Sequence, residues 1–391
     1  MSLATFPAFE GFVREQGLEF KQISGDPEDI LQDLARDGVQ PASLLRLLGG
    51  SVEPLLEKNF AECLQACRDA EVVIYSQIAF FGQQVAEALG IPAIGAGLQP
   101  ILSRTSHFPS AILPVGPGLD GALSPPYNRL SYPVAEQLLW RLLRGSVNRA
   151  RQKVLGLAPI SFGGPFRRFR EEGWPVLYGW SPSLLPKPPD WPDNLTVTGH
   201  WYLDRSAGWE PSRELADFIE SGPRPVCVGF GSTMLHEPEK TTEIVLEALK
   251  RNELRAVLLS GRGGLGKEDL PEEVFLAEEI PHEWLLPRMR AFVHHCSAGT
   301  TAAALRAGVP SAGLPFYGDQ SLWAALIERA GAGERLPAAK LTPQRLANAL
   351  RRATADESLA AARTLGERVR DEDGVGRAVC AFEEHVSSLA P

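Results

Sequence analysis

AFVHHCSAGTTAAALRAGVPSAGLPFYGDQ, residues 291–320, has the pattern of a strand, a turn, a helix, a second turn, a second strand and a loop. Its first residues are apolar, small and polar residues follow, and the alanine-rich run 300–307 favours a helix. Gly308 stands where a C-terminal glycine belongs, and Pro310 prevents the helix from continuing. A second apolar strand over 312–314 would follow. The segment therefore predicts a βαβ unit of a parallel α/β sheet.

The predicted helix begins in a run of small and hydroxyl-bearing residues that suits an anion. The free backbone N–H groups and the dipole of a helix start favour negative charge. Small residues let a phosphate approach the backbone, while hydroxyl groups and an upstream histidine add hydrogen-bond donors. The residues predicted to form this site are His295, Ser297, Ala298, Gly299, Thr300 and Thr301.

An acid and an amide, Asp319 and Gln320, follow the second predicted strand. They would lie at the carboxyl edge of the sheet, where open α/β sheets bind ligands. A carboxylate accepts hydrogen bonds and an amide both accepts and donates, so the pair suits neutral hydroxyl groups. A diphosphate at a helix start beside a polyol indicates a nucleotide sugar.

These residues resemble the donor-binding signature of the UDP-glycosyltransferase superfamily in its bacterial form. The resemblance extends over nearly the whole chain and points to the bacterial and fungal branch similar to sterol 3-beta-glucosyltransferases. The other motifs that carry it are PHEWLLP (281–287), GFGS (229–232), YGWSP (178–182) and VTGHW (197–201).

The resemblance implies an α/β chain with the GT-B fold, in which two Rossmann-like domains face each other across a cleft. We expect an acceptor-binding domain over 1–200, a linker over 201–212 and a donor-binding domain over 213–374. The final helix, 375–391, would pack back towards the first domain. The resemblance adds Gly231, Ser232, Thr233, His282 and Trp284 to the predicted donor site. Trp284 would either stack on uracil or belong to the core.

One departure from the resemblance concerns the first domain. Relatives begin with a strand, a glycine-rich turn and a helix before a segment like SLAT (2–5), and this unit is missing here. We expect either a truncated chain or a start codon assigned too late. The residue that activates the acceptor usually lies in that turn, so the base is expected to precede Met1. Its usual partner acid is replaced by Ser76 and Gln77.

A second departure lies in the signature itself. Relatives commonly have HHGGAGT where this chain has HHCSAGT, residues 294–300. Serine in place of the second glycine requires ordinary backbone angles or strain. We expect donor binding to survive the change.

Composition sets broad bounds on the chain. A length of 391 residues predicts two domains, and the net charge of −9 argues against nucleic acid as a partner. We find neither a signal peptide nor an apolar run long enough to span a bilayer. Five cysteines without framework spacing suit a reducing cytoplasm. Cys63 and Cys67 fit small buried hydrophobes better than metal ligands.

Several elements outside the signature are predicted from apolar runs and helical periodicity. Strands are expected over 18–23, 72–75, 91–94, 225–229, 256–260 and 275–280. Helices are expected over 10–17, 26–36, 42–67, 81–89, 130–155, 241–250, 322–330, from Thr342 onward, and over 357–390.

The long connection 98–126, rich in proline and glycine, would line the acceptor pocket by resemblance. Its His107 is a weak candidate for catalysis, and a surface histidine is the simpler interpretation. The helix 130–155 carries an apolar stripe with interspersed arginines. Core packing with a solvated basic face explains it, and a peripheral contact with a membrane is the sharper alternative.

GRGGLG, residues 261–266, satisfies the dinucleotide pattern directly after a predicted strand. A dinucleotide site needs a helix that opens at the third glycine, and proline at 271 disfavours one here. A dehydrogenase that binds NAD is therefore a minor alternative.

The favoured hypothesis is an inverting glycosyltransferase that moves a hexose, expected to be glucose, from a UDP-sugar to a hydroxyl of an apolar acceptor, such as a sterol, another lipid or a polyketide. No metal and no other cofactor is expected, because the helix start and His295 would offset the charge of the leaving UDP. A nucleotide-sugar-binding protein without catalysis is the alternative, motivated by the missing N-terminal unit. The enzyme is expected to be cytoplasmic.

Overall fold

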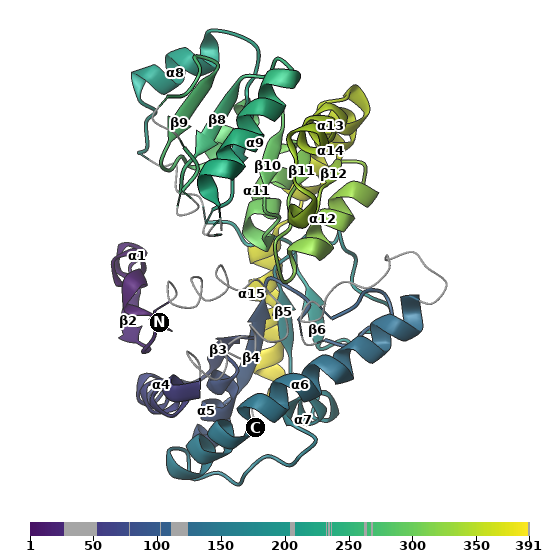
Figure 1. Cartoon of the computed structure of the whole chain (residues 1–391). Coiled ribbons are helices and arrows are strands. Elements are labelled where there is room, and N and C mark those ends of the chain that lie inside the picture. The colour runs from purple at the N-terminus through teal and green to yellow at the C-terminus, as the bar shows by residue number, and fades with distance from the viewer. Residues whose placement is uncertain are drawn as a thin grey trace. The chain divides into compact units, whose positions relative to one another are not determined.

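The structure is a computed structural model of the chain (Figure 1). It describes residues 1–26, 53–77, 79–101, 103–110, 124–203, 208–231, 233, 235, 237–261, 264–266 and 269–389. The chain divides into two compact units, and each is described by itself. Unit 1 comprises Met1–Gly179, Lys187–Val197 and Gly376–Pro391; unit 2 comprises Trp180–Pro186 and Thr198–Val375.

Unit 1 contains two parallel sheets among its described residues. A two-stranded sheet pairs β1 (Ser2–Thr5) with β2 (Glu19–Gln22). A four-stranded sheet has the order β3-β4-β5-β6, and each pairing in it is parallel. Its strands are β3 (Val73–Ser76), β4 (Ala93–Gly97), β5 (Val176–Tyr178) and β6 (Leu195–Val197).

The helices of unit 1 connect these strands and pack on one another. α4 and α6 share a core that includes Phe60, Trp140 and Val147. α5 ends at a left-handed Gly90, as glycine permits. The helices are α1 (Glu10–Glu15), α4 (Glu53–Ala66), α5 (Phe81–Leu89), α6 (Ser124–Lys153), α7 (Pro165–Glu171) and α15 (Gly374–Leu389).

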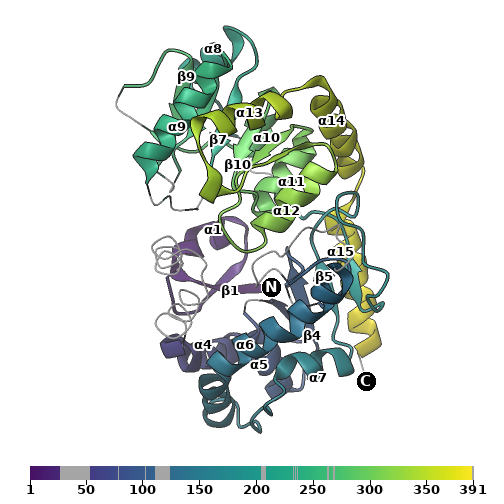
Figure 2. The same ribbon diagram turned by 45° about the vertical axis from the view of Figure 1, so that its right-hand side comes forward.

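Unit 2 is built on a parallel sheet with the order β12-β11-β10-β7-β8-β9 (Figure 1). Strands β9, β7 and β10 of this sheet are also labelled in Figure 2. The strands are β7 (Val226–Gly229), β8 (Ala256–Leu259), β9 (Val274–Ala277), β10 (Phe292–His294), β11 (Ser311–Gly313) and β12 (Gly333–Arg335). The helices are α8 (Arg213–Glu220), α9 (Pro238–Arg251), α10 (His282–Leu285), α11 (Ala298–Ala307), α12 (Gln320–Arg329), α13 (Pro343–Ala353) and α14 (Asp356–Arg370).

Alternation along the strands of unit 2 explains why helices cover both faces of its sheet. Val226 and Val228 point into one core, which contains residues of α9 and α13. Cys227 points the opposite way, into a second core with residues of α8, α10 and α11. Strands buried on both faces are therefore continuously apolar, as parallel sheets require.

The unit boundary differs from a single division at residue 200, because Trp180–Pro186 packs with unit 2. The ring of the fully buried Trp180 lies 6.1 Å from that of Trp323. Glu372 accepts hydrogen bonds from the hydroxyl groups of Ser181 and Ser183, both at 2.7 Å. These contacts hold the segment against unit 2.

The βαβ unit predicted from residues 291–320 is confirmed as β10, α11 and β11, and Gly308 caps α11 with φ +66°. Thr342 caps α13 through a hydrogen bond from Arg345 N. Three short strands were not predicted: β5, β6 and β12. The helix expected over 26–36, apart from Asp26, and residues 42–52 of the helix expected over 42–67 lie outside the described residues. So do residues 102 and 111–123 of the loop 98–126, part of the linker, and Ser232.

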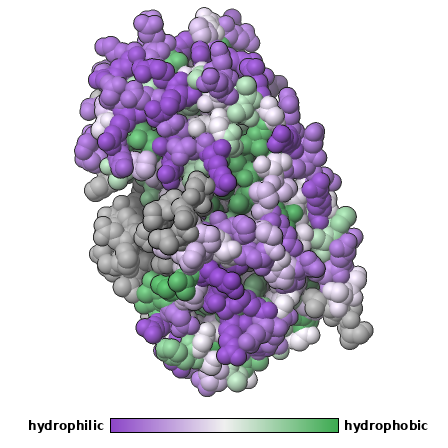
Figure 3. Space-filling model, turned by 90° about the vertical axis from the view of Figure 1, so that its right-hand side faces the viewer, coloured by the Kyte–Doolittle hydropathy of each residue, from purple (hydrophilic) through white to green (hydrophobic). Residues whose placement is uncertain are grey.

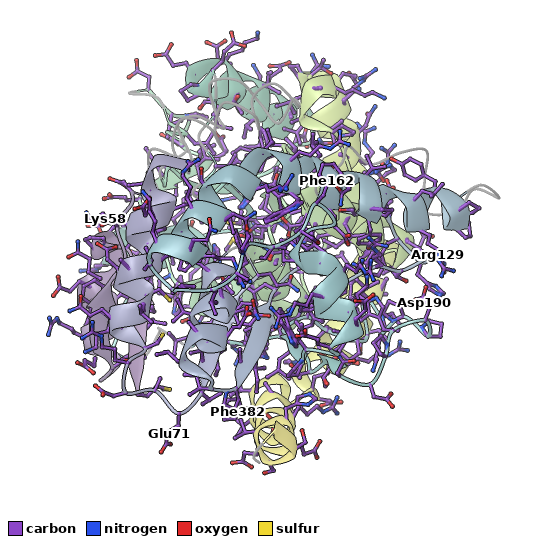
Figure 4. All side chains as sticks on the ribbon, turned by 90° about the horizontal axis from the view of Figure 1, so that it is seen from below. Lys58, Glu71, Arg129, Phe162, Asp190 and Phe382 are labelled. Atoms are coloured by element: carbon purple, nitrogen blue, oxygen red, sulfur yellow. The ribbon has the colours of Figure 1, made fainter. Side chains whose placement is uncertain are left out.

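No helix of the described chain is long and apolar enough to cross a membrane. Hydrophilic residues dominate the face shown in Figure 3, with hydrophobic patches between them. On α6, Leu130 and Val134 are 64% and 57% exposed, which leaves apolar side chains at the surface of unit 1. Arg129 of the same helix and Phe162 are labelled in Figure 4, and the guanidinium groups of Arg141 and Arg144 each lie 5.5 Å from the Phe162 ring.

Candidate functional site

The strand order of unit 2 places a site where β7 and β10 lie side by side. From β7 the sheet grows through β8 and β9, and the chain then returns to add β10, β11 and β12 on the other side of β7. Ligands bind at such reversals, beyond the carboxyl ends of the strands. The loops that leave this point carry Gly231 after β7 and His295 after β10. Both belong to the predicted donor site.

These two residues are in contact. A Cβ atom added to Gly231 would lie 3.1 Å from Cε1 of His295, and Gly231 itself adopts φ +56°. A Cβ on Gly261, which follows β8, would lie 3.2 Å from the Gly231 carbonyl oxygen. Glycine thus allows two loops and the imidazole to meet at one edge of the sheet. Thr233, in the loop after Gly231, is buried.

α11 begins at this edge with its amino end capped by Ser297. The Ser297 hydroxyl accepts from Thr300 N at 3.5 Å and lies 3.0 Å from Thr300 Oγ1. Gly299 is exposed, and a Cβ there would meet no protein atom within 4 Å. The N–H groups of Ala298 and Gly299 belong to the first turn, which has no acceptors within the helix. The start of α11 therefore presents free N–H groups that could bind an anion.

The backbone strain in this turn lies at Cys296. Cys296 has φ +61°, a left-handed angle that only one other described residue apart from glycine adopts, whereas Ser297 has φ −64° and ψ 158°. Serine in place of glycine is thus accommodated with ordinary angles. The cost of the left-handed position falls on a fully buried cysteine, whose N–H donates to Nδ1 of His294 at 3.2 Å.

His295 is 3% exposed, and its Nδ1 has no hydrogen-bond partner within the described chain. Burial, with a smaller effect of His282, lowers the pKa of His295 to about 4. The imidazole is therefore neutral near pH 7, and an adjoining diphosphate would raise this pKa. A ligand at the open helix start can form the hydrogen bond that the buried Nδ1 of His295 lacks.

We expect the depressed pKa of His295 to make the protein acid-sensitive. The unfolded chain binds a proton near pH 6.5 and the folded chain only near pH 4, so stability is present above pH 6.5 and is lost as the pH falls towards 4. The His295 contribution is about 3 kcal/mol. In denaturant unfolding at several pH values, the free energy of unfolding should fall less steeply with decreasing pH for His295→Asn than for the wild type. Equal slopes in the two proteins would contradict the assignment.

Asp319 and Gln320 lie at the amino end of α12, which follows β11 at the same edge of the sheet. Oδ2 of Asp319 accepts from Trp323 Nε1 at 2.6 Å. Oε1 of Gln320 accepts from the N–H groups of Phe316 and Tyr317 at 2.8 and 3.1 Å. These bonds fix both side chains, and the amide nitrogen of Gln320 is then the donor that remains for a ligand hydroxyl.

His282 and Trp284 lie on α10, the short helix that precedes β10. Burial lowers the pKa of His282, whose ring lies 5.6 Å from that of Phe292. The Trp284 ring lies 5.1 Å from that of Trp209, and the Arg288 guanidinium lies 4.3 Å from it. Trp284 is partly buried against the core of α8, α10 and α11.

Unit 1 contains a buried polar cluster that sequence reasoning did not identify. Nε2 of Gln77 donates to the hydroxyl of Tyr178 at 2.8 Å, and Ser103 Oγ also bonds that hydroxyl. Gln77 follows β3 and Tyr178 ends β5, so the cluster lies at the carboxyl edge of this sheet. Burial raises the pKa of Tyr178 to about 12. Oε1 of Gln77 has no partner within the described chain; the only sequence signal was a polar residue directly after a strand.

His107 is exposed, unlike the residues around it. Its N–H donates to Thr105 Oγ1 at 3.1 Å, and Thr105 in turn donates to Asp190. Burial raises the Asp190 pKa, but hydrogen bonds from Thr105 and Ser106 and the charge of His107 outweigh it and lower the pKa.

Within the described residues, no group of three or more acidic, histidine or cysteine side chains is arranged to hold a metal ion. Cys63 packs with Ile23 and Val85.

Comparisons with known proteins found similar sequences and similar structures. Residues 244–375 match the C-terminal domain described as erythromycin biosynthesis protein CIII-like. The chain is 36% identical over 403 residues to a sterol 3-beta-glucosyltransferase of Arabidopsis thaliana, which covers 99% of this chain and 61% of the relative. It is 34% identical over 409 residues to a sterol 3-beta-glucosyltransferase of Cryptococcus neoformans, covering 97% of this chain and 25% of the relative.

The chain thus spans 61% of the plant relative and a quarter of the fungal one. Among solved structures, the glycosyltransferase of kitacinnamycin aligns with a TM-score of 0.72 at 20% identity, over 98% of this chain and 90% of that one. The glycosyltransferase VinC, solved in complex with dTDP, aligns with a TM-score of 0.59 at 18% identity, over 97% and 92%. These structures show that the chain has the GT-B fold.

Proposed function

Because the chain is related to the sterol 3-beta-glucosyltransferases along nearly its whole length and has the GT-B fold, we propose that it is a UDP-dependent glycosyltransferase. It would move a hexose, glucose by analogy with the names of these relatives, to the hydroxyl group of a sterol or a similar apolar acceptor. The observation that carries the proposal is the open start of α11 beside the unpaired Nδ1 of His295, at the reversal of strand order.

In this proposal the diphosphate lies against the first turn of α11. The N–H groups of Ala298 and Gly299, with the hydroxyl groups of this turn, bind its oxygens. His295 donates a further hydrogen bond, and its pKa rises as negative charge develops on the leaving UDP. Asp319 and Gln320 bind the sugar hydroxyls and orient the anomeric carbon. No metal is needed where these groups offset the charge.

We place the acceptor on unit 1 and propose that the enzyme works in the cytoplasm with a peripheral membrane contact. The exposed Leu130 and Val134 of α6, close in sequence to Arg129, suit an interface between water and lipid. Sterol acceptors reside in membranes, so such a contact brings the enzyme to its substrate. Partition of the chain onto neutral phosphatidylcholine vesicles tests this placement.

The proposal is tested by titrating the chain with UDP and with UDP-glucose by calorimetry, and by assaying transfer to a sterol mixture in the same buffer. Binding with formation of a sterol glucoside is the expected result. Binding without transfer would favour the second candidate, a nucleotide-sugar-binding protein without catalysis. Failure of a folded sample to bind either nucleotide would contradict both.

Asp319→Asn should distinguish the contribution of the sugar to binding from that of the nucleotide. Asparagine can still accept from Trp323 Nε1, so the loop is retained, but the charged acceptor for a sugar hydroxyl is lost. We expect affinity for UDP-glucose to fall about tenfold, whereas affinity for UDP is unchanged. Calorimetric titrations with both ligands measure the difference. Exposed Asp217→Asn on α8 is the control, and an equal loss for both ligands would contradict the sugar contact.

A further inference from the structure

A pocket lies at the edge of the unit 2 sheet opposite to the start of α11. Its volume is about 330 Å³, at the small end of ligand pockets. Residues that precede β7, β10 and β11 line it, namely Arg224, Arg290 and Pro310. These strands are parallel, so their amino ends share one edge, and the donor site occupies the other. The pocket is therefore separate from the start of α11.

Three arginines from separate segments of the chain converge on this pocket. Arg224 precedes β7, Arg290 precedes β10, and Arg363 comes from α14. All three are exposed, and none forms an ion pair with a carboxylate in the described part of the chain. Arg290 Nη2 donates to the carbonyl oxygen of Thr354 at 3.4 Å. Three uncompensated positive charges at one pocket stand out in a chain of net charge −9.

The negative end of α11 lies at the same pocket, but its carbonyl groups already have donors. Gly308 N donates to Leu305 O at 2.9 Å, and Val309 N donates to Ala304 O at 3.1 Å. Arg370 Nη1 covers the carbonyl of Arg306 at 2.7 Å. The helix end therefore offsets little of the charge of the three arginines.

The base of the pocket is apolar. Met289 and Val309 are 2% and 6% exposed, and Leu359 of α14 completes the lining. A cationic rim over an apolar base suits a ligand with an anionic group and a less polar body. Guanidinium groups bind phosphate oxygens in pairs, which makes phosphate the anion best matched to such a rim.

We propose that this pocket binds a phosphate-bearing ligand distinct from the sugar donor. The phosphate is held between the guanidinium groups of Arg224, Arg290 and Arg363, and the body of the ligand covers Met289 and Leu359. A soluble phosphate ester and the headgroup of an anionic phospholipid offer the same chemistry.

The test is a calorimetric titration of the whole chain with inorganic pyrophosphate, with the donor site saturated by UDP. The pocket variant is Arg290→Gln with Arg363→Gln, and the charge-matched control is Arg213→Gln with Arg345→Gln, two exposed arginines elsewhere in unit 2. We expect the pocket variant to bind at least about tenfold more weakly than the wild type and the control. Thermal melting checks that all three proteins are folded.

Cosedimentation with phosphatidylcholine vesicles, with and without phosphatidic acid, distinguishes the two sources. If phosphatidic acid increases the fraction of protein bound to vesicles, and the pocket variant loses this increase, the ligand is a lipid headgroup. If the variant keeps the increase in vesicle binding but loses pyrophosphate binding, the ligand is a soluble phosphate ester. Equal behaviour of the wild type, the control and the pocket variant in both experiments would overturn the proposal.

Discussion

Gly299→Val should remove measurable UDP binding and leave the protein folded. Gly299 is exposed in the first turn of α11, and a Cβ there meets no protein atom within 4 Å. Valine is also a better helix former than glycine, so stability should hold or rise slightly. Its side chain would, however, occupy the space in front of the N–H groups of Ala298 and Gly299, where we propose that the diphosphate binds.

The expected effect is large because several hydrogen bonds to a charged group are lost together. Two such bonds amount to about 3 kcal/mol or more, a weakening of at least about a hundredfold. Calorimetry with UDP measures it, and denaturant unfolding checks the fold. Gly11→Val is the matched control, because Gly11 is also exposed in a helix, α1, with nothing within 4 Å of an added Cβ. Wild-type affinity in Gly299→Val would show that the diphosphate binds elsewhere.

Local sequence signals were sufficient to predict most of the strands and helices of unit 2. The βαβ unit of β10, α11 and β11 was predictable because each boundary carries a residue with one strong preference, such as Gly308 at φ +66° and Pro310. β5, β6 and β12 were missed because each has three residues and no period of its own. Such strands depend on pairing with neighbours that are distant in sequence.

Candidate donor residues could be named from the sequence, but the contacts between them could not. His295 meets Gly231 only because β10 lies beside β7, and strand order is not written in either segment. Gln77 and Tyr178 are 101 residues apart, and no local pattern links them. The left-handed angle at Cys296 was not predicted either, because the change of the second signature glycine to Ser297 does not indicate which residue of the turn adopts that angle.

Gly313→Ala should destabilise the protein because of that strained cysteine. Gly313 ends β11, and a Cβ there would lie 2.5 Å from Sγ of the fully buried Cys296. No real contact is so short, and the left-handed backbone gives the thiol little freedom to move. Overpacking of this kind costs about 1–3 kcal/mol. Denaturant unfolding should show the loss as a lower midpoint.

Cys296→Gly should rescue this variant. Glycine removes the thiol that the new methyl group meets, and it adopts φ +61° without the penalty of about 1–2 kcal/mol that other residues incur. The double variant should therefore be more stable than Gly313→Ala alone, with a coupling free energy of about 1–3 kcal/mol. Cys227→Ala removes another fully buried thiol, on β7, and should not rescue. Wild-type stability of Gly313→Ala, or equal rescue by both cysteine changes, would contradict the contact.

Since Cys296 directly precedes the cap of α11, Gly313→Ala should also weaken UDP binding, and Cys296→Gly should restore it. The packing behind the turn would thereby be shown to hold the anion site in place.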